Sequence, residues 1–237
     1  EFCGEKLDKF EVIDWHDAME EYGCDKPDLR IPLKLKEISD LVMNEEFKVF
    51  SDPAKKEGSR VVALKVPNGN TMSRGQIDDY TKFVSKLGAK GLAYIKINDV
   101  KDLENGIQSP ILKFLNKKTI QNIFKTLEVK TDDLIFFGAG SESVVNLSMS
   151  SLIKKLGHDL DLYVSKWAPC WIVNFPMFEL NAEGSLTPLH HPFTLPKASK
   201  KELLENPNDV LAYAYDVVLN GYEIGGGSLR IYDKNMQ

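Results

Sequence analysis

The strongest constraint on the fold is the pair Asn220-Gly221, which follows an apolar run near the end of the sequence. A two-residue type I′ turn needs positive φ at both positions, and Asn-Gly adopts that conformation readily. The pattern predicts a β-hairpin whose first strand is residues 210–219. With a two-residue turn, Leu219 opposes Tyr222 and Val218 opposes Glu223, so Asp216 lies on the same face as Glu223.

The return strand of this hairpin contains three consecutive glycines, Gly225-Gly226-Gly227. Glycine weakens a strand, so such a run usually marks a bulge or a place where a ligand lies against the backbone. Glu223 precedes the run and Arg230 follows it, which suits a small anionic substrate beside a metal or phosphate. The alternative interpretation is an ordinary glycine-rich turn with solvated charges.

Composition restricts the class of protein. The 237 residues are 43% hydrophobic and 27% charged, as in a soluble globular protein with one large domain or two modest ones. The net charge of −5 argues against broad electrostatic binding of nucleic acid, so a nucleic-acid partner must be inferred from a motif. No apolar run is long enough to span a bilayer, and no membrane partner is expected.

Three widely spaced cysteines, Cys3, Cys24 and Cys170, lack zinc-site or CxxC spacing. We interpret them as reduced thiols and expect a cytoplasmic protein. The chain begins with Glu1-Phe2 and no initiator Met, so we expect it to be a piece of a longer protein.

The pattern along the chain predicts an α/β (α+β) protein in three segments, 1–30, 31–164 and 165–237. From residue 31 onward, strands and helices alternate, with strands expected at 47–50, 60–66, 91–98 and 134–137. Ser73 and Gln76 form a capping box for one helix, and Gly157 is expected to close another over 141–156. Residues 1–30 and 165–237 resemble two halves of one sheet domain, separated by the α/β segment.

Five motifs, in order along the whole chain, resemble bacterial-type aspartyl-tRNA synthetase. They are residues 22–30 (YGCDKPDLR), 88–93 (GAKGLA), 175–179 (FPMFE), 190–194 (HHPFT) and 220–228 (NGYEIGGGS). The resemblance implies a partial class II catalytic domain with an antiparallel sheet, formed by 1–30 and 165–237. It also implies that 31–164 is the insertion domain shared with a tRNA-dependent amidotransferase subunit.

This resemblance implies an aspartate-tRNA ligase, which activates L-aspartate with ATP and Mg²⁺ and transfers it to tRNA-Asp, as a homodimer in the full-length protein. The anticodon-binding domain and the three class II motifs have no counterpart here, so the chain alone is not expected to aminoacylate. Two alternatives stay open: a non-catalytic tRNA-binding or scaffolding module related to the amidotransferase, and a non-discriminating enzyme that also charges tRNA-Asn.

The same resemblance assigns the site residues. Arg230 is expected to bind the side-chain carboxylate of aspartate, with His190, Gly227 and Ser228 also contacting aspartate. Asp216 and Glu223 match acidic residues that hold Mg²⁺, and Glu223 also matches an ATP ligand. No side chain is expected to act as a catalytic nucleophile.

Three further expectations concern the surroundings of that site. Only one of the adjacent His190 and His191 can face the pocket, and the other is expected to pack or hydrogen-bond locally. Lys26, Asp28 and Arg30 are expected to be salt-bridged scaffolding. Scattered lysines of the insertion either form a tRNA-facing surface or serve solubility; they are Lys65, Lys82, Lys90 and Lys96.

Glu223 and Arg230 are seven residues apart, so a regular strand would place them on opposite faces. The resemblance requires both to reach one pocket. We therefore predict that Gly225-Gly226-Gly227 contains a bulge that resets the register.

Overall fold

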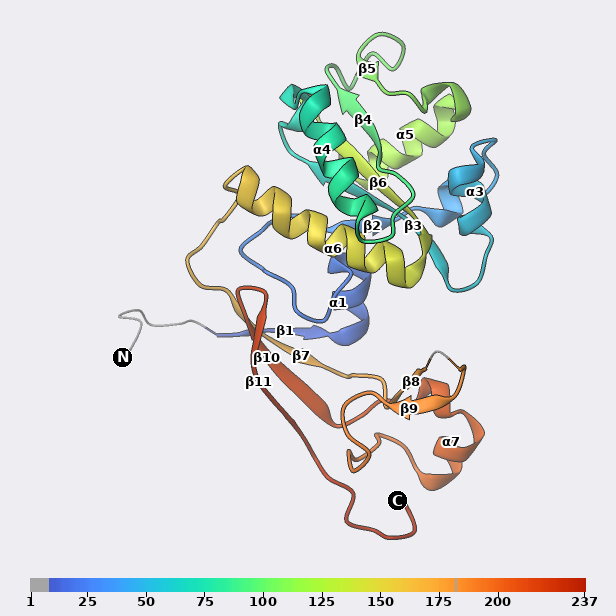
Figure 1. Ribbon diagram of the computed structural model, residues 1–237, viewed down its shortest axis with the longest axis vertical. Coiled ribbons are helices and arrows are strands. Elements are labelled where there is room, and N and C mark those ends of the chain that lie inside the picture. Colours follow the sequence, from blue (N-terminus) through green and yellow to red (C-terminus); the bar gives the residue numbers. More distant parts are fainter. Residues whose placement is uncertain (1–8, 182) are drawn as a thin grey trace. The chain divides into compact units, whose positions relative to one another are not determined.

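The computed structural model describes residues 9–181 and 183–237 of the chain (Figure 1). Cys3 lies outside the described residues. In the described part, the chain forms two compact units. Unit 1 consists of Glu1–Met19, Asp25–Arg30 and Val164–Gln237, and unit 2 consists of Glu20–Cys24 and Ile31–Tyr163.

Both units combine helices with β-strands, so the chain has the mixed α+β fold predicted from its sequence. The strands are β1 (Glu11–Asp14), β2 (Leu35–Glu37), β3 (Ser59–Val66), β4 (Ala93–Ile97), β5 (Ile107–Gln108), β6 (Leu134–Ser141), β7 (Pro169–Val173), β8 (Phe178–Leu180), β9 (Leu186–Pro188), β10 (Ala214–Leu219) and β11 (Tyr222–Ser228). The helices are α1 (Trp15–Tyr22), α2 (Ser39–Val42), α3 (Lys48–Ala54), α4 (Arg74–Ser85), α5 (Lys117–Thr126), α6 (Glu142–Asp159) and α7 (Lys200–Glu205).

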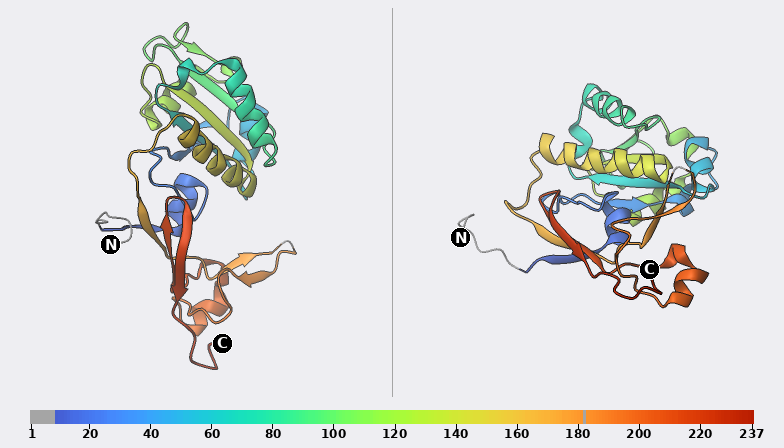
Figure 2. Two further views of the ribbon diagram at one scale, coloured as in Figure 1. Left: turned by 60° about the vertical axis from the view of Figure 1, so that its left-hand side comes forward. Right: turned by 60° about the horizontal axis from the view of Figure 1, so that its bottom comes forward.

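Unit 2 is built on a five-stranded sheet in the order β2-β3-β6-β4-β5, with every neighbouring pair antiparallel among the described residues. Helices α4 and α6 cover one face, while α2, α3 and α5 pack against the other (Figure 2). Successive residues of β3 alternate between the two cores: Val62 and Leu64 face the first, and Val61 and Ala63 the second. Burial on both faces explains why β3 and β6 are continuous apolar runs in the sequence.

The predicted strand at residues 47–50 is wrong, because this segment leads into helix α3. A short apolar run fits a buried helix as well as a strand, and Phe50 reaches the sheet from α3 by packing on Phe137. Gly157 also does not end its helix, since α6 continues to Asp159. A Cβ there would lie 2.3 Å from Ile31 Cδ1, so close packing explains this glycine.

The capping box at the start of α4 is confirmed. The Ser73 hydroxyl accepts a hydrogen bond from the Gln76 N–H at 3.2 Å, and the Gln76 side chain accepts one from the Ser73 N–H at 2.8 Å. This arrangement satisfies two N–H groups that the first helical turn leaves without partners.

Unit 1 contains a four-stranded sheet in the order β1-β7-β10-β11. Strand β1 precedes the insertion and β7 follows it, and the two pair in parallel from Glu11↔Cys170 to Asp14↔Val173. The pairs β7–β10 and β10–β11 are antiparallel, so the expected antiparallel sheet includes one parallel edge. The Val164 N–H also donates to the Arg30 carbonyl at 2.9 Å, so the backbone leaves and re-enters unit 1 at adjacent points.

The predicted hairpin between β10 and β11 is confirmed. Asn220 and Gly221 have φ values of 52° and 83°, as a type I′ turn requires. Leu219 pairs with Tyr222, and Val218 with Glu223. The Asn220 side chain fixes the turn by accepting from the Ala168 N–H at 3.0 Å and donating to the Lys166 carbonyl at 3.1 Å.

None of the helices in the described part of the chain has both the length and the apolar character needed to cross a membrane.

Two glycines of unit 2 provide a matched test of its packing. Gly23 and Gly58 both have φ of +69°, but a Cβ at Gly23 would lie 2.8 Å from the Asn146 carbonyl oxygen, whereas one at Gly58 has nothing within 4 Å. Gly58→Ala should cost about 1–2 kcal/mol of unfolding free energy through backbone strain alone. Gly23→Ala should cost at least about 2 kcal/mol more, because backbone must also move. Urea denaturation of both variants measures the difference, and equal losses would contradict this account of Gly23.

Candidate functional site

The β10–β11 hairpin carries two acidic side chains on one face. Ala214, Asp216 and Val218 alternate with more exposed residues along β10, so these three point the same way. Glu223 pairs directly with Val218, and directly opposed residues of antiparallel strands lie on the same side. The carboxylates of Asp216 and Glu223 therefore share a face, as the two-residue turn predicts.

Asp216 is a carboxylate in a largely apolar setting. Only 5% of its surface is exposed, and its β-sheet neighbours are Ile172 and Gly226. Within residues 9–181 and 183–237, its carboxylate forms no hydrogen bond or salt bridge. Burial raises the pKa of Asp216 and the charge of Glu223 raises it further, while His190 acts in the opposite direction. The electrostatic environment therefore favours an additional positive charge beside Asp216.

Lys26 brings a positive charge to this face from the segment that joins the two units. Its Nζ lies 3.3 Å from Glu223 Oε2 and 3.8 Å from Asp25 Oδ1. Burial lowers the pKa of Lys26, but the Asp25 and Glu223 carboxylates outweigh that effect, so its pKa is raised overall. Lys26 is therefore held as a cation by the acidic face.

The predicted register change in β11 is present, one residue before the glycines. Val218 pairs with Glu223 and Val217 with Gly225, which leaves Ile224 as an extra residue in the strand. After this bulge, Gly226 opposes Asp216 and Ser228 opposes Ala214. Ser228 thus shares the face of Glu223 despite an odd spacing, and continued alternation puts Arg230 on that face too.

The three glycines have different roles. A Cβ on Gly226 would lie 2.3 Å from Asp216 Oδ1, so the absence of a side chain leaves room for that carboxylate. A Cβ on Gly227 would lie 2.7 Å from the Tyr215 hydroxyl, whereas one on Gly225 would meet nothing within 4 Å. A side chain at Gly226 would therefore displace the buried Asp216 carboxylate, whereas one at Gly227 would need only the exposed Tyr215 side chain to shift.

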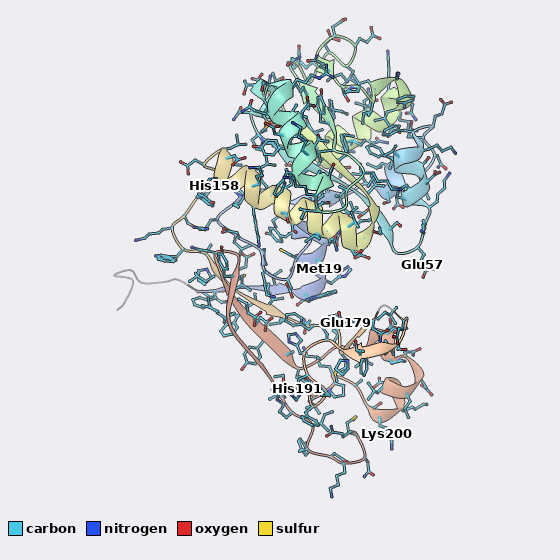
Figure 3. All side chains as sticks on the ribbon, viewed as in Figure 1. Met19, Glu57, His158, Glu179, His191 and Lys200 are labelled. Carbon is cyan, nitrogen blue, oxygen red and sulfur yellow. The ribbon has the colours of Figure 1, made fainter. Side chains whose placement is uncertain are left out.

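The two adjacent histidines lie in the segment between β9 and α7, where Figure 3 labels His191. The His191 ring accepts a hydrogen bond through Nδ1 from the Phe193 N–H at 3.1 Å, which is the local bond predicted for one of the pair. The exposed His190 packs edge-on against Phe175, with ring centroids 4.3 Å apart. Of the two histidines, only His190 is among the groups that shift the pKa of Asp216.

Backbone hydrogen bonds connect this segment to the end of the hairpin. The Leu195 N–H donates to the Leu229 carbonyl at 2.8 Å, and the Ile231 N–H donates to the Phe193 carbonyl at 2.8 Å. Thr194 and Arg230 form the bridge between these bonds. Arg230 is exposed, and its guanidinium has no hydrogen bond or salt bridge to any described residue, so it is available to bind a ligand.

The chemistry of the acidic face fits Mg²⁺ better than a metal held entirely by protein. Among the described residues, there is no group of three or more His, Cys, Asp or Glu side chains arranged to hold a metal. Mg²⁺ usually takes one or two carboxylates, several waters and substrate phosphates. Asp216 and Glu223 supply such a pair, and the space at Gly226 accommodates the Asp216 carboxylate.

Most of the insertion lysines singled out above have partners within unit 2. Lys65 donates to the Glu128 carbonyl at 3.0 Å, Lys82 pairs with Asp79 at 3.0 Å, and Lys96 donates to a backbone carbonyl. Lys90 instead lines a groove of about 880 Å³ whose wall includes Tyr94.

The sequence did not reveal the contact between Lys26 and the hairpin. Asp28 and Arg30 do form the expected scaffold, because the Arg30 guanidinium donates to both Asp28 carboxylate oxygens at 2.9 and 2.6 Å. Lys26 instead pairs with Glu223, far along the chain. No sequence signal indicates this pair, because Lys26 and Glu223 are far apart along the chain and share no periodic pattern.

Residues 50–149 match the family model described as the GAD domain. This domain occurs in class II aspartyl-, asparaginyl- and lysyl-tRNA synthetases and in GatB-type proteins. The match lies within unit 2 and covers less than half of the chain. It relates the chain, at the level of this domain, to aminoacyl-tRNA synthetases and to tRNA-related partners.

Substitutions at neighbouring glycines test the packing around Asp216. Gly226→Ala should lower the unfolding free energy by about 1–3 kcal/mol, because the new methyl group displaces a buried carboxylate. Gly225→Ala should be neutral or stabilise by up to about 1 kcal/mol, since it adds strand propensity in open space. Thermal or urea unfolding of the two variants provides the comparison, and a loss at Gly225 equal to that at Gly226 would rule out the proposed contact.

The raised pKa of Asp216 predicts a pH dependence of stability in metal-free buffer. A carboxyl whose folded pKa exceeds the unfolded value of about 3.9 destabilises the fold as pH rises through that window. Asp216→Asn should therefore be more stable than wild type at pH 7, and its advantage should shrink as pH falls toward 4. Urea unfolding at several pH values measures this, with the exposed Asp209→Asn as control. A stability difference that stays constant with pH would refute the prediction.

Proposed function

We propose that this chain forms part of an aspartate-tRNA ligase, which activates L-aspartate with ATP and transfers it to tRNA-Asp. The observation that carries the proposal is the hairpin, in which the bulge at Ile224 puts Asp216, Glu223 and Ser228 on one face. Continued alternation beyond Ser228 would add Arg230 to that face. The GAD domain match supports a synthetase-related protein. A binding module would have no need to keep this set of charges together.

The proposed chemistry needs no nucleophilic side chain. An α-carboxylate oxygen of aspartate attacks the α-phosphorus of ATP, a new P–O bond forms, and the bond to pyrophosphate breaks. A hydroxyl of the terminal adenosine of tRNA then attacks the activated carbonyl and releases AMP. The protein's contribution is to position the reactants and to stabilise charge on the phosphate oxygens.

Arg230 is the proposed selector for the side-chain carboxylate of aspartate. A guanidinium offers a planar, permanently charged fork that matches a carboxylate with two hydrogen bonds. His190 approaches from the segment that is hydrogen-bonded to the end of β11. Gly227 and Ser228 form the floor beneath the substrate.

Asp216 and Glu223 are the proposed Mg²⁺ ligands, and Glu223 also contacts ATP. When bound, Mg²⁺ supplies neutralisation of the charge that develops on the phosphate oxygens. Asp216 is suited to this role because its buried carboxylate has no partner among the described residues. Glu223 is suited because it lies on the same face and is more exposed.

The proposed enzyme is a cytoplasmic homodimer in its full-length form, with tRNA-Asp as its RNA substrate. A related alternative is a non-discriminating enzyme that also charges tRNA-Asn. Comparing kcat/KM for the two tRNAs with the full-length protein distinguishes these enzymes. Charging of tRNA-Asp alone supports the discriminating form.

A second candidate is a non-catalytic tRNA-binding or scaffolding module. It is favoured by the GAD domain match, which covers part of unit 2 alone, and by the groove of about 880 Å³ in that unit. Aspartate-dependent exchange between pyrophosphate and ATP separates the two functions. A full-length protein that binds tRNA without any exchange activity would favour the module.

Arg230→Leu tests the role of the guanidinium in the full-length protein. The aspartate KM for pyrophosphate exchange should rise on the order of 10- to 100-fold, because a hydrogen-bonded charge pair is worth about 1.5–3 kcal/mol. The KM for ATP should change less than about threefold, since the fork contacts the amino acid. Lys234→Leu, at a nearby exposed cation, is the control.

If the Arg230→Leu protein keeps an aspartate KM within about threefold of wild type and an unchanged kcat, Arg230 is not the selector. Arg230→Lys sharpens the result, because it keeps the charge but removes the fork. An intermediate KM is expected for that variant.

A further inference from the structure

Lys26 lies where a metal cation would be expected on the acidic face. Its ammonium group is within 4 Å of both Glu223 and Asp25, and its charge also acts on Asp216. Asp216 is 5% exposed and has no hydrogen bond or salt bridge to a described residue. A nearly buried, unpartnered carboxylate and a partly exposed cation thus lie close enough for their charges to interact.

The backbone on either side of Lys26 is well anchored. Pro27 is buried and restricts the conformation of Lys26, and the two-point contact between Asp28 and Arg30 holds the following turn. The lysine side chain, by contrast, has four rotatable carbon–carbon bonds and remains partly exposed. The ammonium group can therefore leave Glu223 without any movement of the backbone.

A divalent cation bound to Glu223 would compete directly with Lys26. A metal–oxygen bond needs the carboxylate that now faces the ammonium at 3.3 Å, and two cations at that separation repel each other. In the absence of metal, Lys26 also reduces the repulsion between Glu223 and Asp216. The same side chain thus keeps the carboxylates together and weakens metal binding to them.

We propose that Lys26 is a positioning residue that holds Glu223 in the metal-free protein and is displaced by Mg²⁺, so that tight metal binding requires nucleotide phosphates. The displaced ammonium then pairs with phosphate oxygens, for which lysine is a suitable partner. This inference rests on the proposed function of the acidic pair as a Mg²⁺ site. It adds a residue that controls when the metal binds.

The test measures binding of Mn²⁺ alone, as a paramagnetic substitute for Mg²⁺, to the full chain without nucleotide. Lys26→Met should bind the metal at least about tenfold more tightly than wild type, because a competing positive charge is gone. Lys26→Arg should restore weak binding, since it keeps the charge. Lys234→Met, at an exposed lysine outside the acidic face, should match wild type.

A stability measurement provides an independent readout. In EDTA, Lys26→Met should have a lower Tm than wild type, because Glu223 and Asp216 lose their shared counter-charge. Added Mg²⁺ should then raise the Tm of Lys26→Met more than that of wild type. A merely structural lysine would give a lower Tm that metal does not restore.

Equal or weaker Mn²⁺ binding by Lys26→Met, or no binding by any variant, would overturn the inference. Its outcome is separable from that of the proposed function. Tighter metal binding by Lys26→Met without aspartate activation by the full-length wild type would uphold the role of Lys26 and reject the ligase. Aspartate activation by the full-length wild type, together with unchanged metal affinity in Lys26→Met, would uphold the ligase and reject the role of Lys26.

Discussion

The parallel pairing of β1 with β7 is the interaction on which unit 1 depends. It joins residues 11–14 to residues 170–173, and the Asn174 side chain reinforces it by donating to Asp14 at 2.6 Å. Parallel strands need a long crossover connection, and here that connection includes all of Ile31–Tyr163. The entropic cost of closing a loop grows only with the logarithm of its length. Because the insertion is also stabilised by its own two cores, this cost does not prevent β1 from pairing with β7. Strand β7 in turn pairs with β10, and this pairing fixes the position of Asp216 opposite Ile172.

The candidate site depends on an irregularity in the pairing of β10 with β11. A hairpin alone would turn Glu223 and Arg230 to opposite faces, but one extra residue at Ile224 brings the later residues of β11 onto the acidic face. Gly226 then leaves the space that the Asp216 carboxylate occupies. Burial and the charge of Glu223 raise the pKa of Asp216, so a positive charge beside it would stabilise the ionised carboxylate. The bulge and the glycine that weaken β11 as a strand are thus the same features that bring Ser228 onto the acidic face and leave room for the Asp216 carboxylate.

Local chemistry made part of this structure predictable. The Asn220-Gly221 turn, its register and the Ser73 capping box depend on neighbouring residues, and all three are confirmed. The odd spacing of Glu223 and Arg230 predicted a bulge within Gly225-Gly226-Gly227, but the extra residue is Ile224, one position earlier. Spacing alone requires one extra residue somewhere between the two charges and does not select which one. The strand expected at 47–50 was wrong, because this segment leads into helix α3. Phe50 is apolar because it packs in the core, and a helix can place it there as well as a strand can. The pairing of Lys26 with Glu223 joins distant segments and left no periodic signal.

The hydrogen bond between the Val164 N–H and the Arg30 carbonyl shows that the two ends of the stretch between them are adjacent. Where a chain leaves and re-enters a domain at neighbouring points, a whole module can be spliced in or deleted without altering the order of the strands around it. A gene encoding unit 1 could therefore acquire the stretch from Ile31 to Tyr163 in a single recombination event. Conversely, a short turn across this point is long enough to replace that stretch without changing the strand order of unit 1.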